Sequence, residues 1–290
     1  MKIAVIGAGK MGVWFAKFFN SKGYAVTLAD RKEEKLANLK GLPVDLTTDF
    51  KEAVGCADQV LICVSIDALE EVVKIIAPAL QEGQVVMDIC SIKENPVNIM
   101  HQYIKDALVL GTHPVFGPGS NGVKHKAYIL TPTDAEEQRF AEHFKIWLEQ
   151  EEAHVFIMPP KKHDELMSIV LGLPHFLGLV ACETLLEQKN FSETKKVAGT
   201  TYRMLLTLAE ATALETPDLY ASLQTNLPDL RKIEDQFIAN AQEWLNLIKS
   251  KDADAIVKRM EQIKKKLRET DRDFANSYDD MYKMLESTEK

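Results

Sequence analysis

A glycine-rich turn near the start of the chain has the spacing of a dinucleotide-binding loop. Gly7, Gly9 and Gly12 follow the apolar run Ile3–Ile6 and precede a segment rich in aromatic residues, so the motif lies between an expected strand and an expected helix. The first glycine permits a tight turn, the second lets backbone approach a pyrophosphate, and the third lets the helix pack on the strand. The helix N-terminus adds free N–H groups and a partial positive charge. The predicted phosphate-binding residues are Gly7, Gly9, Lys10, Met11 and Gly12.

A carboxylate at the end of the second expected strand bears on the choice of cofactor. Asp30 follows Ala25–Ala29, eighteen residues after Gly12, where a carboxylate accepts the adenosine ribose hydroxyls and repels a 2′-phosphate. We therefore expect NAD. NADP stays open because Arg31 is adjacent and can pair with a 2′-phosphate. Ser65, at the end of a later strand, is either a further cofactor contact or a plain turn serine.

Two later strand ends carry groups suited to proton transfer. His113 follows the expected strand Val109–Gly111 and precedes a loop dense in glycine and proline. With an ordinary pKa near 6.5, a histidine there can take the proton of a substrate hydroxyl as hydride leaves the same carbon. Ser91 follows the expected strand Val85–Ile89 and either caps the next helix or faces the cleft. The alternative is that His113 has no catalytic role and simply begins the loop.

Two ionisable groups stand in apolar helical stretches of the second half. His175 follows Leu173-Pro174, and Arg203 follows Thr201-Tyr202. An arginine among apolar residues needs a carboxylate partner, because a buried unpaired charge is costly. That carboxylate belongs either to the protein or to a ligand, and the second choice predicts an anionic substrate.

Composition excludes several classes of protein. The chain has 290 residues, 35 basic and 43 acidic, for a formal net charge of −8, and shows no basic run interleaved with aromatics, so we expect no nucleic acid partner. The four cysteines lack the short paired spacing of a metal site. The first apolar run is too short for a signal peptide or a membrane span. We expect a cytoplasmic protein without metal.

The chemistry-bearing residues sit on two unlike halves. Short β-rich runs alternate with helical stretches up to residue 158, which predicts an α/β fold with a doubly wound parallel sheet of the Rossmann type. From residue 159 to 290 apolar residues recur at helical spacing, and Pro159-Pro160 suits a helix start. The expected helices are Lys161–Gln188, Ser192–Ala213, Pro217–Lys249 and Asp252–Leu285.

Taken together, these motifs resemble the prephenate and arogenate dehydrogenase family of tyrosine biosynthesis. The resemblance runs over nearly the whole chain, through Gly7–Gly12, Asp88–Lys93, His113–Gly117, Leu173–His175, Tyr202-Arg203 and Pro217–Tyr220. It implies a Rossmann domain followed by a helical dimerisation domain, and hence a homodimer. It also implies that His113 is catalytic, that Ser91 orients it, that Arg203 binds a substrate carboxylate and that His175 supports substrate binding.

The implied reaction is the NAD-dependent oxidative decarboxylation of prephenate to 4-hydroxyphenylpyruvate. Arogenate, which carries an ammonium group in place of the side-chain keto group, is the alternative substrate. Glu210 lies seven residues after Arg203, on the same face of a helix, and is either an acceptor for that ammonium or a surface acid. Two other classes stay open: an enzyme like the 3-hydroxyacid dehydrogenases, and a non-catalytic NAD-binding sensor.

Overall fold

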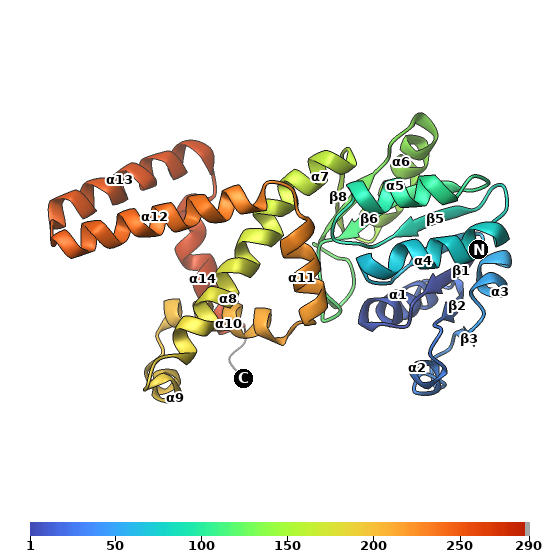
Figure 1. Ribbon diagram of the computed structural model, residues 1–290, viewed down its shortest axis with the longest axis horizontal. Helices are drawn as coiled ribbons and strands as arrows, with labels where there is room; N and C mark the ends of the chain where they lie inside the picture. Colours follow the sequence, from blue (N-terminus) through green and yellow to red (C-terminus); the bar gives the residue numbers. More distant parts are fainter. Residues whose placement is uncertain (288–290) are drawn as a thin grey trace. The chain divides into compact units, whose positions relative to one another are not determined.

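The computed structural model describes residues 1–287, which form two compact units. The first comprises Met1–Met167 and Ala221–Pro228, and the second comprises Ser168–Tyr220 and the described residues from Asp229 onward. The first unit contains an eight-stranded sheet, whereas the described part of the second consists of helices and connecting turns. Figure 1 shows both units. The expected α/β fold followed by a helical region is confirmed.

The sheet has the strand order of a doubly wound fold. Its order is β3-β2-β1-β4-β5-β6-β7-β8, and every neighbouring pair is parallel except β6 and β7. Strands β3, β7 and β8 extend the sheet beyond the five strands that the sequence predicts. The strands are β1 (Lys2–Ile6), β2 (Ala25–Ala29), β3 (Asp45–Thr47), β4 (Gln59–Ile62), β5 (Val85–Asp88), β6 (Leu108–Pro114), β7 (Ala127–Thr131) and β8 (His154–Ile157).

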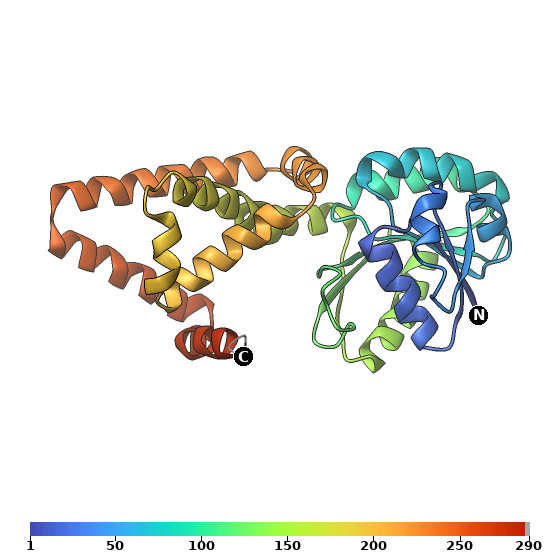
Figure 2. The ribbon, with the colours of Figure 1, turned by 90° about the horizontal axis from the view of Figure 1, so that it is seen from below.

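Helices cover both faces of this sheet (Figure 2). Phe15 and Phe19 of α1 and Phe144 of α6 pack in one buried cluster with the sheet, and α3, α4 and α5 supply the cluster on the other face. Spacings of three and four residues put the apolar positions of each helix on one side. The helices are α1 (Lys10–Ser21), α2 (Glu33–Ala37), α3 (Phe50–Gly55), α4 (Ile66–Ile76), α5 (Glu94–Tyr103), α6 (Ala135–Gln150) and α7 (Pro160–Met167).

The strand order lines up the segments that carry polar groups. Parallel pairing aligns Ile6 with Ile62, Ile62 with Asp88, and Asp88 with Gly111, so β1, β4, β5 and β6 end at one edge of the sheet. The glycine loop, Ser65, Ser91 and His113 follow or close these strands in the same order. The β2-β1-β4 neighbourhood is also where the strand order reverses, the usual ligand site in such sheets.

The second unit is built from helices that are shorter than the sequence predicts. The expected helix Pro217–Lys249 is wrong as one element: it ends at Asn226 and resumes at Leu230, because Pro228 lacks an N–H and Asp229 has a left-handed φ of 56°. The expected helix Asp252–Leu285 is likewise interrupted after Thr270. The helices after residue 172 are α8 (Leu173–Leu186), α9 (Phe191–Thr194), α10 (Thr200–Leu214), α11 (Pro217–Asn226), α12 (Leu230–Ser250), α13 (Ala253–Thr270) and α14 (Ser277–Glu286). Of these, α11 belongs to the second unit only as far as Tyr220.

One helical segment is unusually apolar for its exposure. A π-helical turn at Ser168–Gly172 joins α7 to α8, and the continuous helix Pro160–Leu186 is long and apolar enough to cross a membrane by length and composition. Little of its most apolar stretch is buried within the chain. Its first turns, however, include Lys161 and Lys162 and pack on α5 and β7. An exposed apolar helix of this kind marks an interaction surface.

The aromatic cluster beneath the sheet yields a stability prediction. Phe144 stacks on Trp147 at 5.7 Å and meets the Tyr128 ring edge-on at 6.1 Å. Replacing this buried ring in Phe144→Ala leaves a cavity, and we expect a loss of about 3–5 kcal/mol in the free energy of unfolding. Ile146→Ala on the same helix is the control, because Ile146 is 54% exposed; it should change stability by no more than about 0.5 kcal/mol. Urea titrations measure both, and equal losses would contradict the packing.

Candidate active site

The glycine loop has the shape needed to hold a phosphate group. Gly7 has a φ of 110°, which favours glycine, and a Cβ on Gly12 would lie 1.8 Å from the Gly7 carbonyl oxygen. Gly9 differs, because a Cβ there would meet no atom within 4 Å. Gly9 is also the N-cap residue of α1, and no side chain caps that helix start. Exposed Lys10 and half-buried Met11 begin the helix.

Asp30 is built into the loop. Its Oδ2 accepts the N–H of Ala8 at 2.9 Å and bonds Lys35 Nζ at 3.1 Å, while Oδ1 accepts the N–H of Lys32 at 3.0 Å. Burial alone would raise the pKa of Asp30, but these hydrogen bonds outweigh it and lower the pKa. An ionised carboxylate therefore stands beside the loop, where the adenosine ribose of a dinucleotide lies in this fold.

Two further residues expected at the cofactor are exposed. Arg31 lies 3.3 Å from the Glu71 carboxylate, so its charge already has a partner. Ser65 is the N-cap residue of α4 and makes no side-chain capping bond. Both lie at the same edge of the sheet as the loop, because they follow β2 and β4.

His113 lies at the end of β6, as the sequence predicts, and is 4% exposed. Burial, with the nearby His163 and Lys93, holds its pKa well below the ordinary value, so the imidazole is neutral at pH 7. Half-buried Ser91 lies in the turn after the neighbouring strand β5. A neutral buried imidazole is suited to accept a proton.

A buried ion pair joins these two strand ends. Lys93 Nζ bonds the Asp88 carboxylate and donates to the Thr112 carbonyl oxygen at 2.6 Å. Asp88 in turn accepts the N–H groups of Cys90, at 2.8 Å, and Thr112. Both charged side chains are fully buried. The turn that carries Ser91 is thereby fixed to the residue that precedes His113.

Two residues behind His113 were not predicted from the sequence. Nδ1 of His113 lies 2.8 Å from Nε2 of His163, and Nδ1 of His163 lies 2.7 Å from Oδ1 of Asp164. Both residues stand in the first turns of α7 and are buried. The adjacent His-Asp pair in the otherwise polar segment Lys161–Glu165 was the available signal, but its partner lies fifty residues away in sequence.

His175, in α8 of the second unit, packs its ring against Tyr220 at 4.4 Å between centroids. Burial lowers the pKa of His175. Within residues 1–287 its buried Nδ1 has no hydrogen-bond partner. A buried polar atom in this state costs free energy that a bound group would recover.

Arg203 and Glu210 both lie on α10, which packs on α8. Arg203 is half-buried. Glu210 is exposed, and its Oε1 bonds Lys195 Nζ at 2.6 Å. The structure therefore gives the Glu210 carboxylate a cation from the chain itself.

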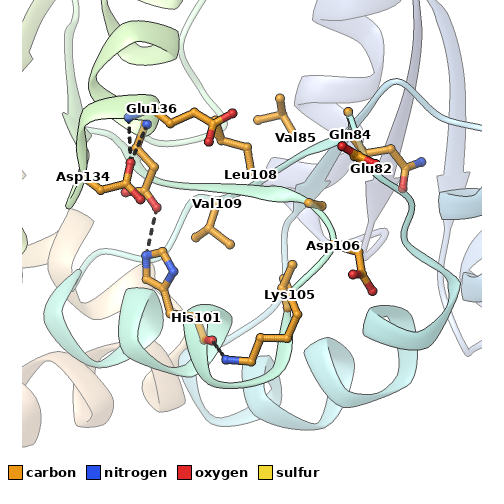
Figure 3. A pocket seen from close by; sticks show the side chains of 14 residues that line it. Glu82, Gln84, Val85, His101, Lys105, Asp106, Leu108, Val109, Asp134 and Glu136 are labelled. Carbon is orange, nitrogen blue, oxygen red and sulfur yellow. Dashed lines mark hydrogen bonds and ion pairs between the residues drawn. The ribbon is translucent and has the colours of Figure 1, made fainter.

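A hollow of about 580 Å³ at the other end of the sheet is unrelated to these groups (Figure 3). It is lined by the first residues of β5 and β6 and by His101, Asp134 and Glu136. Its acidic lining is unsuited to an anionic ligand. In the described part of the chain no group of three or more His, Cys, Asp or Glu side chains could hold a metal ion.

The glycine loop fits a dinucleotide, and Gly9 offers the test. Because the space beside Gly9 is open, Gly9→Ala should fold with an unchanged melting temperature, while its methyl group occupies the approach of the pyrophosphate. We expect the Kd for NADH to rise at least tenfold in a fluorescence titration. Gly41→Ala, at another open site without a positive φ, is the control for added bulk and should leave the Kd unchanged. An unchanged Kd in Gly9→Ala would exclude this loop as the phosphate site.

Comparison with known proteins places the chain in a family. The family model "Prephenate dehydrogenase, nucleotide-binding domain" matches residues 15–157, and "Prephenate dehydrogenase, dimerization domain" matches residues 159–262. A probable arogenate/prephenate dehydrogenase of Methanocaldococcus jannaschii is 35% identical over 272 residues, 91% of this chain. A cyclohexadienyl dehydrogenase of Zymomonas mobilis is 25% identical over 280 residues. The chain spans 60% of the first relative and 94% of the second.

Solved structures share the fold. A crystal structure of prephenate dehydrogenase from A. aeolicus, in complex with hydroxyphenyl propionate and NAD+, aligns with a TM-score of 0.76 at 21% identity, over 93% of this chain and 98% of that one. A Synechocystis arogenate dehydrogenase aligns with a TM-score of 0.68 at 19% identity, over 93% and 99% of the two chains. With two family models that together match most of its length, the chain belongs to the prephenate dehydrogenase family.

Proposed function

We propose that the protein is an NAD-dependent prephenate dehydrogenase, which converts prephenate to 4-hydroxyphenylpyruvate and carbon dioxide. The observation that carries the proposal is His113, a buried neutral imidazole at the sheet edge that also holds the glycine loop and Asp30. The family assignment supports it, since relatives are described as prephenate, arogenate or cyclohexadienyl dehydrogenases. Arogenate is the alternative substrate.

Each group in the first unit has a role in this reaction. Bound NAD+ would supply the acceptor for the hydride that leaves the ring carbon bearing the hydroxyl group. His113 takes the hydroxyl proton, which its neutral state allows. Ser91, on the adjacent turn, orients the hydroxyl and the histidine. Loss of the ring carboxylate as carbon dioxide leaves an aromatic ring, which makes the reaction effectively irreversible.

The second unit supplies groups for the anionic substrate. We assign Arg203 to a substrate carboxylate, because guanidinium and carboxylate match in geometry and charge. His175 supports substrate binding, and its unsatisfied Nδ1 within the described chain is consistent with a contact to a ligand. The net charge of −8 opposes a dianionic substrate, so binding must depend on such local groups.

A homodimer accounts for the exposed apolar helix. Ile169, Val170, Leu179 and Val180 are each at least 39% exposed in the single chain. They lie within the region that matches the family's dimerization domain. We propose that a second copy covers these side chains, since exposed apolar residues that gather on one helix mark an interaction surface.

An absorbance assay of NADH formation tests the substrate. We expect turnover with prephenate and NAD+, and weaker turnover when NADP+ replaces NAD+. Turnover of a hydroxyacid, with no turnover of prephenate or arogenate, would overturn the proposal in favour of an enzyme like the 3-hydroxyacid dehydrogenases. NADH binding without turnover of any substrate would overturn it in favour of a non-catalytic NAD-binding sensor.

If Glu210 accepts the arogenate ammonium, Glu210→Gln should lower kcat/KM for arogenate about tenfold relative to prephenate; an unchanged ratio assigns Glu210 only to its ion pair with Lys195.

A histidine variant tests the proton acceptor. His113→Asn should lower kcat by about 10²–10⁴-fold, because the side chain no longer accepts the proton, while the Kd for NADH stays unchanged. Because the pKa of His113 is lowered, the wild-type kcat/KM should hold its plateau below pH 6.5 and fall only in more acidic solution, as the base becomes protonated. Arg203→Ala should instead raise KM. Near-normal turnover by His113→Asn would remove this mechanism.

A further inference from the structure

We propose that Asp164 is a positioning residue that, through His163, fixes which nitrogen of His113 is free to accept the substrate proton. The inference rests on the proposed function for the identity of the reaction, but its geometry does not. Asp164, His163 and His113 form a continuous chain of contacts at 2.7 Å and 2.8 Å. His163 is fully buried and the other two are each 4% exposed. The positions of the protons on the two imidazole rings are therefore set by contacts among the three side chains rather than by bulk water.

Asp164 sets the donor-to-acceptor direction of these hydrogen bonds, because its carboxylate oxygens act as acceptors. Oδ1 accepts the N–H of Lys93 at 2.7 Å, and Oδ2 accepts the N–H of Glu94 at 2.9 Å. Oδ1 also contacts Nδ1 of His163, so that nitrogen must carry the proton and donate.

The tautomers of the two histidines follow from this. Burial lowers the pKa of His163 despite the hydrogen bond from its ring to Asp164, so the ring is neutral at pH 7. A neutral ring with its proton on Nδ1 has a bare Nε2, which accepts from Nδ1 of His113. His113 then holds its own proton on Nδ1 and leaves Nε2 as a lone pair. That tautomer can accept a hydroxyl proton.

The same carboxylate also positions the turn that carries Ser91. The N–H groups that Asp164 holds belong to Lys93 and Glu94, at the start of α5 and two to three residues after Ser91. Lys93 in turn bonds the Thr112 carbonyl next to His113. Asp164 therefore fixes Ser91 and His113 relative to each other as well as the tautomer. A residue that only capped α5 would stabilise the helix without affecting the protonation of His113.

The variant that separates these roles is Asp164→Asn, which keeps the size of the side chain. Its amide can donate to Nδ1 of His163, which shifts the His163 proton to Nε2 and the His113 proton to its own Nε2, the wrong tautomer for a base. We expect kcat to fall about 10²–10⁴-fold while the Kd for NADH changes less than twofold. Glu165→Gln removes the next carboxylate along α7, which is half-buried and bonds Lys162 at 3.5 Å; this control should keep kcat within twofold.

Nitrogen-15 NMR of the histidine rings reads the tautomers without any substrate. In the wild type we expect a protonated Nδ1 in both His113 and His163; in Asp164→Asn we expect the proton on Nε2 of both. Spectra of His113→Asn and His163→Gln assign the signals. A proton on Nε2 of wild-type His113, or a shifted tautomer in Asp164→Asn together with kcat within threefold of wild type, would overturn the proposal.

Variants of His163 keep the test decisive if Asp164→Asn fails to fold. Glutamine can offer its carbonyl oxygen to His113 and its N–H groups to Asp164, so His163→Gln should retain at least tenfold more kcat than His163→Leu. Equal kcat values in these two variants would contradict the proposal. If the wild type turns over neither prephenate nor arogenate, the proposed reaction fails, but the NMR result still decides the role of Asp164.

Discussion

The buried ion pair between Lys93 and Asp88 is the constraint on which the active-site edge depends. Removing two charges from water costs several kcal/mol per ion, and the pair is tolerable only with further hydrogen bonds. Asp88 obtains them from the backbone of Cys90 and Thr112, and Lys93 from the Thr112 carbonyl. Two strand ends and the turn between β5 and α5 are thus held by one cluster. Loss of either charge alone would leave the other buried and unpaired.

This cluster also sets the electrostatics around the catalytic base. Burial, followed by the charge of Asp88, raises the pKa of the Cys63 and Cys90 thiols, which therefore remain protonated and unreactive. Burial, with His163 and Lys93, has the opposite consequence for His113, whose cationic form is disfavoured. Burial from solvent thus keeps the two thiols protonated and the His113 imidazole neutral, the state in which it can accept a proton.

The parts of the site that the sequence predicts are those with a local signal. Gly7 to Gly12, Asp30 and His113 each follow a short apolar strand, and parallel pairing then places them at one edge. His163 and Asp164 have no such signal, because their function arises from contacts with residues fifty or more positions away. The interruption between α11 and α12 at Pro228-Asp229 was not predicted, because helical apolar spacing continues across it in the sequence, although Pro228 itself disfavours a continuous helix.

Helix α7 explains why the boundary between the compact units lies several residues after the domain boundary indicated by the sequence. The helix begins at Pro160, directly after the Pro159 that marks a helix start in the sequence, and the second family model begins at residue 159. Yet α7 belongs to the compact unit of the sheet, which continues to Met167. His163 must reach β6, and Asp164 must reach α5, so these turns have to pack beside the sheet. The π-helical turn at Ser168–Gly172 comes directly after this requirement ends, and from there the apolar helix is free to serve a different surface.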